Sequence, residues 1–270
     1  MRQQAANPAA DTADPVSNAV VSPEASLLLR QILQSALKNQ GGTPANWVAE
    51  AQALLANVLM NDYLNWWNLA FPVDVAAAQA AVDYVLQLNP PPPDPVRAQA
   101  YHAQGLIYRA DRTPQKQRLA RDAFNQARQL DPGFARAHAQ FGNQKSLLGR
   151  ESEAHAPLDR ARNLSPRHPA SGYFYWAEGR AYFQEGIWSN AINWLKKSVE
   201  ALPTVWYNRC YLAAAQNSAG DQTGARRTMT DFINAPGFDP ATFTRIKQLK
   251  PDPNDPARKR VLDFVQPLLP

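Results

Sequence analysis

Four histidines and a single cysteine are the side chains in this sequence best suited to metal binding or nucleophilic catalysis. His102 and His138 lie 36 residues apart, and no two histidines have the four-residue spacing of a helical zinc site. Cys210 lies within the aromatic stretch 206–211, which favours a buried, unreactive thiol. Residues 41–44, GGTP, lack the glycine spacing and the lysine of a phosphate-binding loop. The sequence therefore predicts no enzyme, no metal site and no cofactor.

Charge and composition narrow the classes of partner. The chain has 270 residues, a formal net charge of +5 and a pI near 9.4, which raises the question of nucleic-acid binding. The basic residues are dispersed, however, and the longest cluster, 258–260, has Asp252, Asp255 and Asp263 around it. This pattern disfavours a nucleic-acid partner.

Location is predicted from three features of the sequence. No apolar stretch approaches the roughly 18 residues of a membrane-spanning helix. The N-terminus has no apolar segment of the kind that secretory signals carry, and one cysteine cannot form an internal disulfide. We therefore expect a cytoplasmic protein without membrane insertion.

The residues that could bind a partner are positioned by an internal repeat. Small, large and proline residues recur at fixed distances, with 12 residues from the alanine to the proline in each copy. The copies are Ala78/Val82/Val85/Pro90, Ala120/Phe124/Ala127/Pro132, Ala154/Leu158/Ala161/Pro166 and Ala191/Leu195/Ser198/Pro203. The helices before them carry a matching series, Gly105, Gly142 and Gly179. Because small residues let two helices approach closely and proline ends the second helix, the pattern predicts an all-α array of antiparallel helix pairs.

These motifs, with Gly105-x-x-Tyr108 and Gly179-x-x-Tyr182, resemble the tetratricopeptide repeat family. The resemblance covers roughly residues 45–236. It implies a right-handed superhelical solenoid whose concave groove, lined by the first helix of each pair, binds peptides or protein surfaces.

A second resemblance is to bacterial repeat regions attached to class III nucleotide cyclases or response regulators. It is carried by the segments 54–65 and 174–181. It implies an alternative role as the regulatory or sensory segment of a larger bacterial signalling protein, such as a cyclase or a transcription regulator. No cyclase or DNA-binding domain is recognisable in this sequence.

Four regions follow along the chain. Residues 1–24 are rich in small and polar types and are predicted to be a disordered arm. A capping helix is expected at 25–40, the repeat array of about four to five units at 45–236, and a C-terminal loop and capping helix at 237–270. Val261, Leu262 and Val265 give that last helix an apolar side that can cover the final unit.

The groove residues are predicted as first-helix positions outside the glycine and tyrosine series. Aromatic residues cluster there, and because the four at 173–176 cannot share one helix face, at least one of them is expected to point outward or into the groove. Arginine, asparagine and exposed aromatic side chains are suited to holding a peptide. The candidates are His102, Arg109, Arg136, Gln140, Asn143, Tyr173, Trp176, Arg180 and Tyr207. The expected role is a non-enzymatic scaffold for a protein or peptide partner, with homo-oligomer formation left open.

Overall fold

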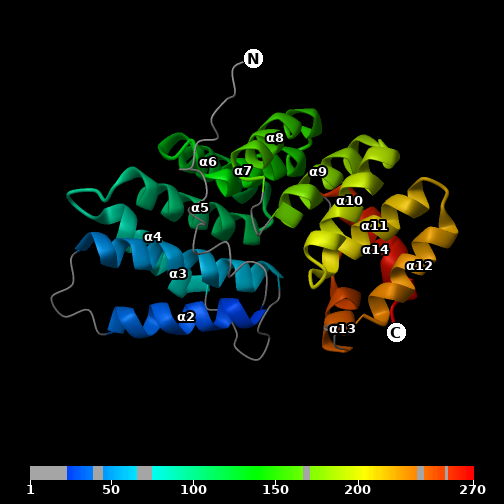
Figure 1. Cartoon of the computed structure of the whole chain (residues 1–270), viewed down its shortest axis with the longest axis horizontal. Helices are drawn as coiled ribbons and strands as arrows, with labels where there is room; N and C mark the ends of the chain where they lie inside the picture. The colour runs from blue at the N-terminus through cyan, green and yellow to red at the C-terminus, as the bar shows by residue number, and fades with distance from the viewer. Residues whose placement is uncertain (1–22, 39–44, 66–74, 167–170, 236–239, 253–254) are drawn as a thin grey trace, which may run out of the picture.

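The computed structural model describes residues 23–38, 45–65, 75–166, 171–235, 240–252 and 255–270. Within these ranges the protein is all-α, as predicted (Figure 1). The helices are α2 (Pro23–Lys38), α3 (Ala45–Asn65), α4 (Val75–Gln87), α5 (Asp94–Ala110), α6 (Pro114–Leu130), α7 (Ala135–Leu147), α8 (His155–Leu164), α9 (Ser171–Glu185), α10 (Trp188–Ala201), α11 (Trp206–Ser218), α12 (Gln222–Ile233), α13 (Pro240–Gln248) and α14 (Pro256–Val265). Short 3₁₀ helices, η2 (Glu151–Glu153) and η3 (Gln266–Leu268), precede α8 and follow α14.

Helices α6 and α12 each begin at a side chain that caps the first turn. Pro114 occupies the first turn of α6, where its missing N–H leaves no helical bond unmade, and the Thr113 hydroxyl accepts a hydrogen bond from the Lys116 amide at 3.4 Å. Asp221 caps α12 in the same way, accepting from the Gly224 amide at 2.8 Å. These caps fix where α6 and α12, the second helices of two pairs, begin after their turns.

Consecutive helices pack as pairs. The pairs are α3 with α4, α5 with α6, α7 with α8, α9 with α10, and α11 with α12. Contacts between neighbouring pairs, such as α3 with α5 and α7 with α9, join them into one continuous solenoid (Figure 1). At its beginning α2 packs on α3. The arm predicted at 1–24 lies almost wholly outside the described residues.

The repeated glycines mark the closest approach within three of these pairs. A Cβ atom added to Gly105 would lie 2.4 Å from the Phe124 ring, and one added to Gly179 would lie 2.7 Å from Leu195. The added Cβ at Gly142 would meet Leu158 at 2.8 Å. Phe124, Leu158 and Leu195 themselves are fully buried. The glycines of the first helices therefore pack against the large apolar residues of the second helices. The same contact recurs in α5–α6, α7–α8 and α9–α10.

The two ends of the solenoid approach each other across its concave side. Leu202 and Val205, in the turn between α10 and α11, belong to the same apolar cluster as residues of α2 and α3. The hydroxyl of Tyr207 on α11 donates a hydrogen bond to Asn65 Oδ1 at the end of α3, at 3.2 Å, across 142 residues of sequence. The concave side is therefore closed into a central space.

The C-terminal segment packs against the first helices. α14 contacts α11 and α9, and Val261, Leu262 and Val265 on it are buried. α13 reaches the last pair through the Phe243 ring, which lies 5.3 Å from the ring of Phe232 on α12. Within the C-terminal segment, α14 therefore lies against the first helices of the last two pairs, whereas α13 lies against α12.

Candidate functional site

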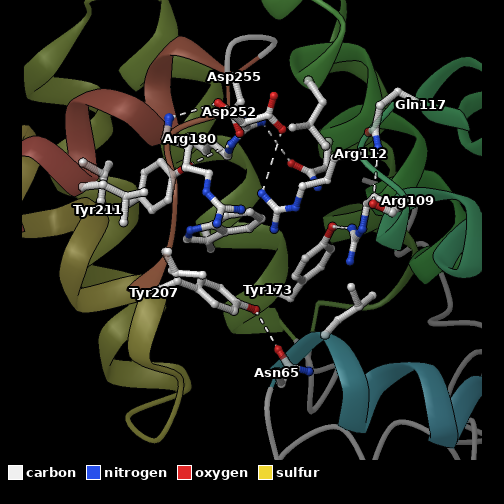
Figure 2. Close-up of a pocket in the computed structure, with 18 of the residues that line it drawn as sticks. Asn65, Arg109, Arg112, Gln117, Tyr173, Arg180, Tyr207, Tyr211, Asp252 and Asp255 are labelled. Carbon is white, nitrogen blue, oxygen red and sulfur yellow. Dashed lines mark hydrogen bonds and ion pairs between the residues drawn. The ribbon is translucent and has the colours of Figure 1, made fainter. Parts of the chain in front are cut away.

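The central space holds a pocket of about 360 Å³ (Figure 2). Its walls come from five first helices and from the C-terminal segment. They include Leu64 and Asn65 of α3, Arg109 of α5, Asn143 and Leu147 of α7, Tyr173, Trp176 and Arg180 of α9, Trp206, Tyr207 and Tyr211 of α11, and Leu249, Asp252, Asp255, Arg258, Val261 and Leu262 of the C-terminal segment. Arg112, Pro114, Gln117 and Leu148 complete the lining. A volume of this size is in the range of small-molecule sites.

One side of the pocket is a polar cluster drawn from three helix pairs. Arg109 Nη1 donates hydrogen bonds to Gln140 Oε1 and, at 3.2 Å, to the Tyr173 hydroxyl. The Tyr173 hydroxyl in turn donates to Gln140 Oε1 at 2.6 Å. Burial raises the pKa of Tyr173, so this phenol stays protonated and remains a donor at neutral pH. Among the described residues, no carboxylate forms an ion pair with Arg109.

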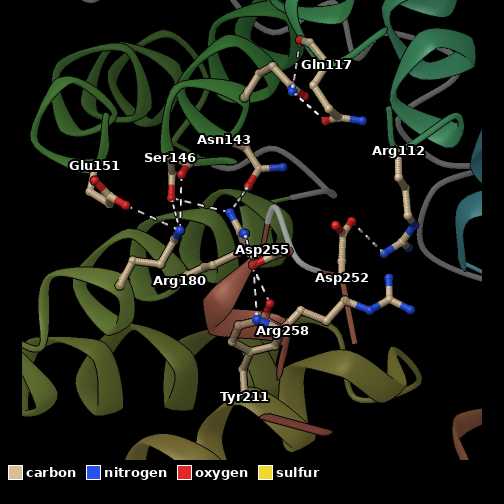
Figure 3. Close-up of polar contacts among 12 residues, drawn as sticks. Arg112, Gln117, Asn143, Ser146, Glu151, Arg180, Tyr211, Asp252, Asp255 and Arg258 are labelled. Carbon is tan, nitrogen blue, oxygen red and sulfur yellow. Dashed lines mark hydrogen bonds and ion pairs between the residues drawn. The ribbon is translucent and has the colours of Figure 1, made fainter. Parts of the chain in front are cut away.

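The other side is built around Arg180, whose side chain is only 1% exposed. Its Nη2 donates to Asp255 Oδ1 at 2.9 Å, its Nε to the Tyr211 hydroxyl at 3.3 Å, and its Nη1 to Ser146 Oγ at 3.3 Å and Asn143 Oδ1 at 3.5 Å (Figure 3). Burial by itself lowers the pKa of Arg180, but the Asp255 carboxylate and the Tyr211 hydroxyl raise it by more. The guanidinium therefore stays charged.

Asp255 does two things at once. Its Oδ1 accepts the hydrogen bond from Arg180 and also one from the Arg258 amide at 3.0 Å, which caps the first turn of α14. The same carboxylate therefore starts the helix and attaches it to α9. Nearby, Arg112 lies 4.0 Å from Asp252. These two ion pairs join the repeats to the C-terminal segment.

Aromatic rings form the floor between the two polar sides. The Trp176 ring centroid lies 4.8 Å from that of Tyr207, 5.6 Å from that of Tyr211 and 5.7 Å from that of Tyr173. Burial raises the pKa of Tyr211 to about 12 and also raises that of Tyr207. All three phenols are therefore neutral at physiological pH, and the floor is apolar with hydroxyl groups at its edge.

The chain's single cysteine does not line this pocket. Burial raises the pKa of the Cys210 thiol, which keeps it protonated and unreactive. The described residues contain no group of three His, Cys, Asp or Glu side chains placed to hold a metal ion. No described helix has the length and apolar character needed to cross a membrane.

Three solved structures share this arrangement of helices. The Pseudomonas aeruginosa protein pilF is 15% identical over 81% of this chain and 89% of its own, with a TM-score of 0.54. PilW, described as a widely conserved type IV pilus biogenesis factor, is 18% identical over 77% and 89%, with a TM-score of 0.53. A tetratricopeptide repeat protein from Parabacteroides merdae is 11% identical over 92% and 96%, with a TM-score of 0.51. The fold is that of the tetratricopeptide repeat proteins. A scan of protein-family models and a search of curated proteins give no match.

In this tetratricopeptide repeat fold, the structure gathers most of the predicted groove residues. Arg109, Asn143, Tyr173, Trp176, Arg180 and Tyr207 line the pocket. Arg136 and Gln140 line a small adjoining cavity together with Arg109, Tyr173 and Tyr207. Several of them are less accessible than a groove position suggests, because Arg136, Gln140, Asn143 and Arg180 are each buried. Arg180 in particular already has the chain's own Asp255 as its partner.

His102 does not line the groove, so that prediction is wrong. Its side chain is fully buried, its ring lies 5.1 Å from that of Phe134 and 5.7 Å from that of Phe124, and its Nδ1 shares a hydrogen bond with Asn57 Oδ1. Burial, followed by the charges of Arg136 and Arg109, holds its pKa well below the ordinary value. A neutral histidine that joins α5 to α3 is a packing residue.

Sequence reasoning missed the residues that come from turns and from the C-terminal segment. Arg112 lies in the longer turn before α6, and Asp252, Asp255 and Arg258 lie in or after the proline-punctuated loop. Tyr211 lies one helical turn after the predicted groove residue Tyr207 on α11. Of these missed residues, it is the one that helical spacing could have placed on the concave side. In the sequence, the Asp-Pro pairs at 252–253 and 255–256 are typical of loops and helix starts, but they do not indicate which repeat these residues meet.

Proposed function

We propose that this protein is a non-enzymatic protein-interaction scaffold that binds a segment of a partner protein on its concave side. The observation that carries the proposal is the polar cluster of Arg109, Gln140 and Tyr173. Each of these residues comes from a different helix pair, and all three meet at the central space. The buried Arg180 is paired within the chain, with Asp255, whereas Arg109 forms no ion pair with a described carboxylate. A charged cluster at the concave side is therefore more than stacking of the repeats requires.

The chemistry of the walls suits a short segment with one anchoring side chain. Trp176 and Tyr207 offer adjacent ring surfaces, which are common among residues that dominate binding energy. Arg109 offers a guanidinium that pairs with carboxylates or backbone carbonyls. The closed ends of the solenoid favour entry of one segment or loop over the passage of a long extended peptide.

The proposal is tested by selecting displayed peptides on the intact protein and measuring them against Arg109→Gln. Loss of one charge-assisted hydrogen bond should weaken a selected peptide by about ten- to a hundredfold. Arg226→Gln is the matched control, because Arg226 is exposed on α12 and does not line the pocket. Peptides that bind the protein and both variants equally would place recognition elsewhere on the solenoid.

The other roles considered from the sequence stay hypotheses. A nucleic-acid-binding array predicts oligonucleotide affinity that falls steeply with salt, which a titration at two salt concentrations checks. A regulatory segment of a bacterial signalling protein predicts a cyclase or transcription regulator encoded beside this chain. Self-association is measured directly by sedimentation of the intact protein. Location in the cytoplasm is tested by cell fractionation.

A further inference from the structure

The pocket carries more positive charge than its own acidic residues neutralise. Four arginines and two aspartates line it. Arg180 pairs with Asp255 at 2.9 Å, and Arg112 lies 4.0 Å from Asp252. Arg109 and Arg258 form no ion pair with any described residue. Two guanidinium groups of the pocket, those of Arg109 and Arg258, therefore lack an ion-pair partner, and their neighbours in the lining are mainly aliphatic and aromatic.

Hydrogen-bonding capacity is also unbalanced toward donors. In the described part of the chain, the buried Trp176 Nε1–H and Arg258 Nε–H have no acceptor, and both residues line the pocket. Asn61 Nδ2, from the adjoining cavity, is a third buried donor that lacks one. A buried donor without an acceptor lowers the stability of the fold by about 1–3 kcal/mol, so buried donors are usually paired. These buried atoms have almost no exposed surface, so a ligand in the pocket meets the charge imbalance of Arg109 and Arg258 and not these donors.

The volume limits the size of that ligand. About 360 Å³ lies near the lower end of the range of small-molecule sites, about 300–1,000 Å³, so it suits a ligand with one ring or a short chain. The rings of Tyr173, Trp176 and Tyr207 offer surface for an apolar or aromatic body. Asp252 and Asp255 also line the pocket and oppose a doubly charged group such as phosphate.

We propose that the pocket binds a small organic carboxylate with an aromatic or aliphatic body, attracted by Arg109 of the repeats and Arg258 of the C-terminal segment. This gives the protein a small-molecule ligand in addition to the scaffold role. Because Arg109, Tyr173, Trp176 and Tyr207 line both sites, the carboxylate and a partner segment exclude each other. Binding also favours the docked position of α14, since Arg258 belongs to that helix.

The test uses phenylalkanoates, from phenylacetate to 5-phenylvalerate, against the intact protein by saturation-transfer NMR and calorimetry. The matched control ligands are the corresponding primary amides, which keep the shape and lose the charge. We expect at least one acid to bind, with its amide weaker by about tenfold or more. Inorganic phosphate is the third probe and is expected to give no signal that depends on Arg109. Because the comparison of acid with amide uses the unaltered protein, it does not depend on any variant folding.

Two variants locate the binding. Arg109→Gln should weaken the acid by about ten- to a hundredfold and leave the amide unchanged. Trp176→Phe keeps a ring but reduces the aromatic surface beside Tyr173 and Tyr207, and should weaken acid and amide by the same small factor. Arg226→Gln on α12 should change neither. Absence of binding by every acid, equal binding of acid and amide, or phosphate binding lost in Arg109→Gln would overturn the proposal. No protein partner is needed, so the outcome is independent of the scaffold role.

Discussion

The ion pair between Arg180 and Asp255 gives the sharpest prediction about this fold. Asp255→Asn removes the negative charge but keeps a side chain that caps α14 and can accept one hydrogen bond from Arg180. The guanidinium is then left charged in a site where it is 1% exposed. Arg180→Met removes the positive charge and leaves the Asp255 carboxylate unpaired. The double variant removes both charges of this ion pair.

The magnitude follows from burial. Removing one partner of a buried pair costs about 3–5 kcal/mol, and the retained cap and amide oxygen place Asp255→Asn at the lower end, about 3 kcal/mol. Because the double variant has no unpaired charge, we expect it to be no less stable than either single variant. The sum of the two single losses minus the loss in the double variant then gives a coupling energy between the two positions of at least about 3 kcal/mol.

Urea unfolding of the four proteins, followed by circular dichroism, measures this coupling. With an m-value near 2–3 kcal/mol/M, Asp255→Asn should lower the midpoint by about 1 M. If the loss is confined to undocking of α14, trypsin should cut faster at 258–260 while the midpoint changes less. Additive effects of the single variants, with a coupling below about 0.5 kcal/mol and unchanged trypsin cleavage, would refute the assignment of this pair as the attachment of α14.

Three further predictions concern the repeats. Gly105→Ala places a Cβ 2.4 Å from the Phe124 ring and should destabilise the protein by about 1–3 kcal/mol in urea unfolding, whereas an unchanged midpoint would contradict that contact. The Glu178 carboxylate, 2.8 Å from His155 Nδ1, raises the pKa of that histidine despite partial burial. The stability advantage of the native protein over His155→Gln should therefore be full below about pH 6.5 and fall as pH rises through the raised pKa, and a constant difference from pH 5.5 to 8.5 would argue against it. Tyr207→Phe loses the hydrogen bond across the concave side and should cost about 1 kcal/mol in thermal unfolding, more than Tyr84→Phe on the exposed side of α4.

The repeat register could be predicted because it is a local property of the sequence. Gly105 and Phe124 recur as Gly142 and Leu158 and then as Gly179 and Leu195, and each small residue meets its large partner within the same helix pair. Such contacts join residues close in sequence, so periodicity and residue size are sufficient to find them.

Accessibility of the first-helix side chains could not be predicted from the sequence in the same way. First-helix position predicts that a side chain is on the concave side, but not whether a neighbour covers it. His102 and Tyr173 both met the criterion, and the structure buries the first against Phe124 and Phe134 while the second lines the pocket.

What the sequence alone determined is the all-α array, its helix pairs and most of the residues on the concave side, because these depend on contacts within one repeat or between adjacent ones. Only the tertiary structure decided that Tyr207 meets Asn65 across 142 residues and that Arg180 meets Asp255 across 75. Helical periodicity indicates which face of a helix is buried but carries no information about which distant face covers it. The pocket exists because the solenoid closes on itself and the C-terminal segment folds back onto it, and both depend on the summed curvature of all the repeats.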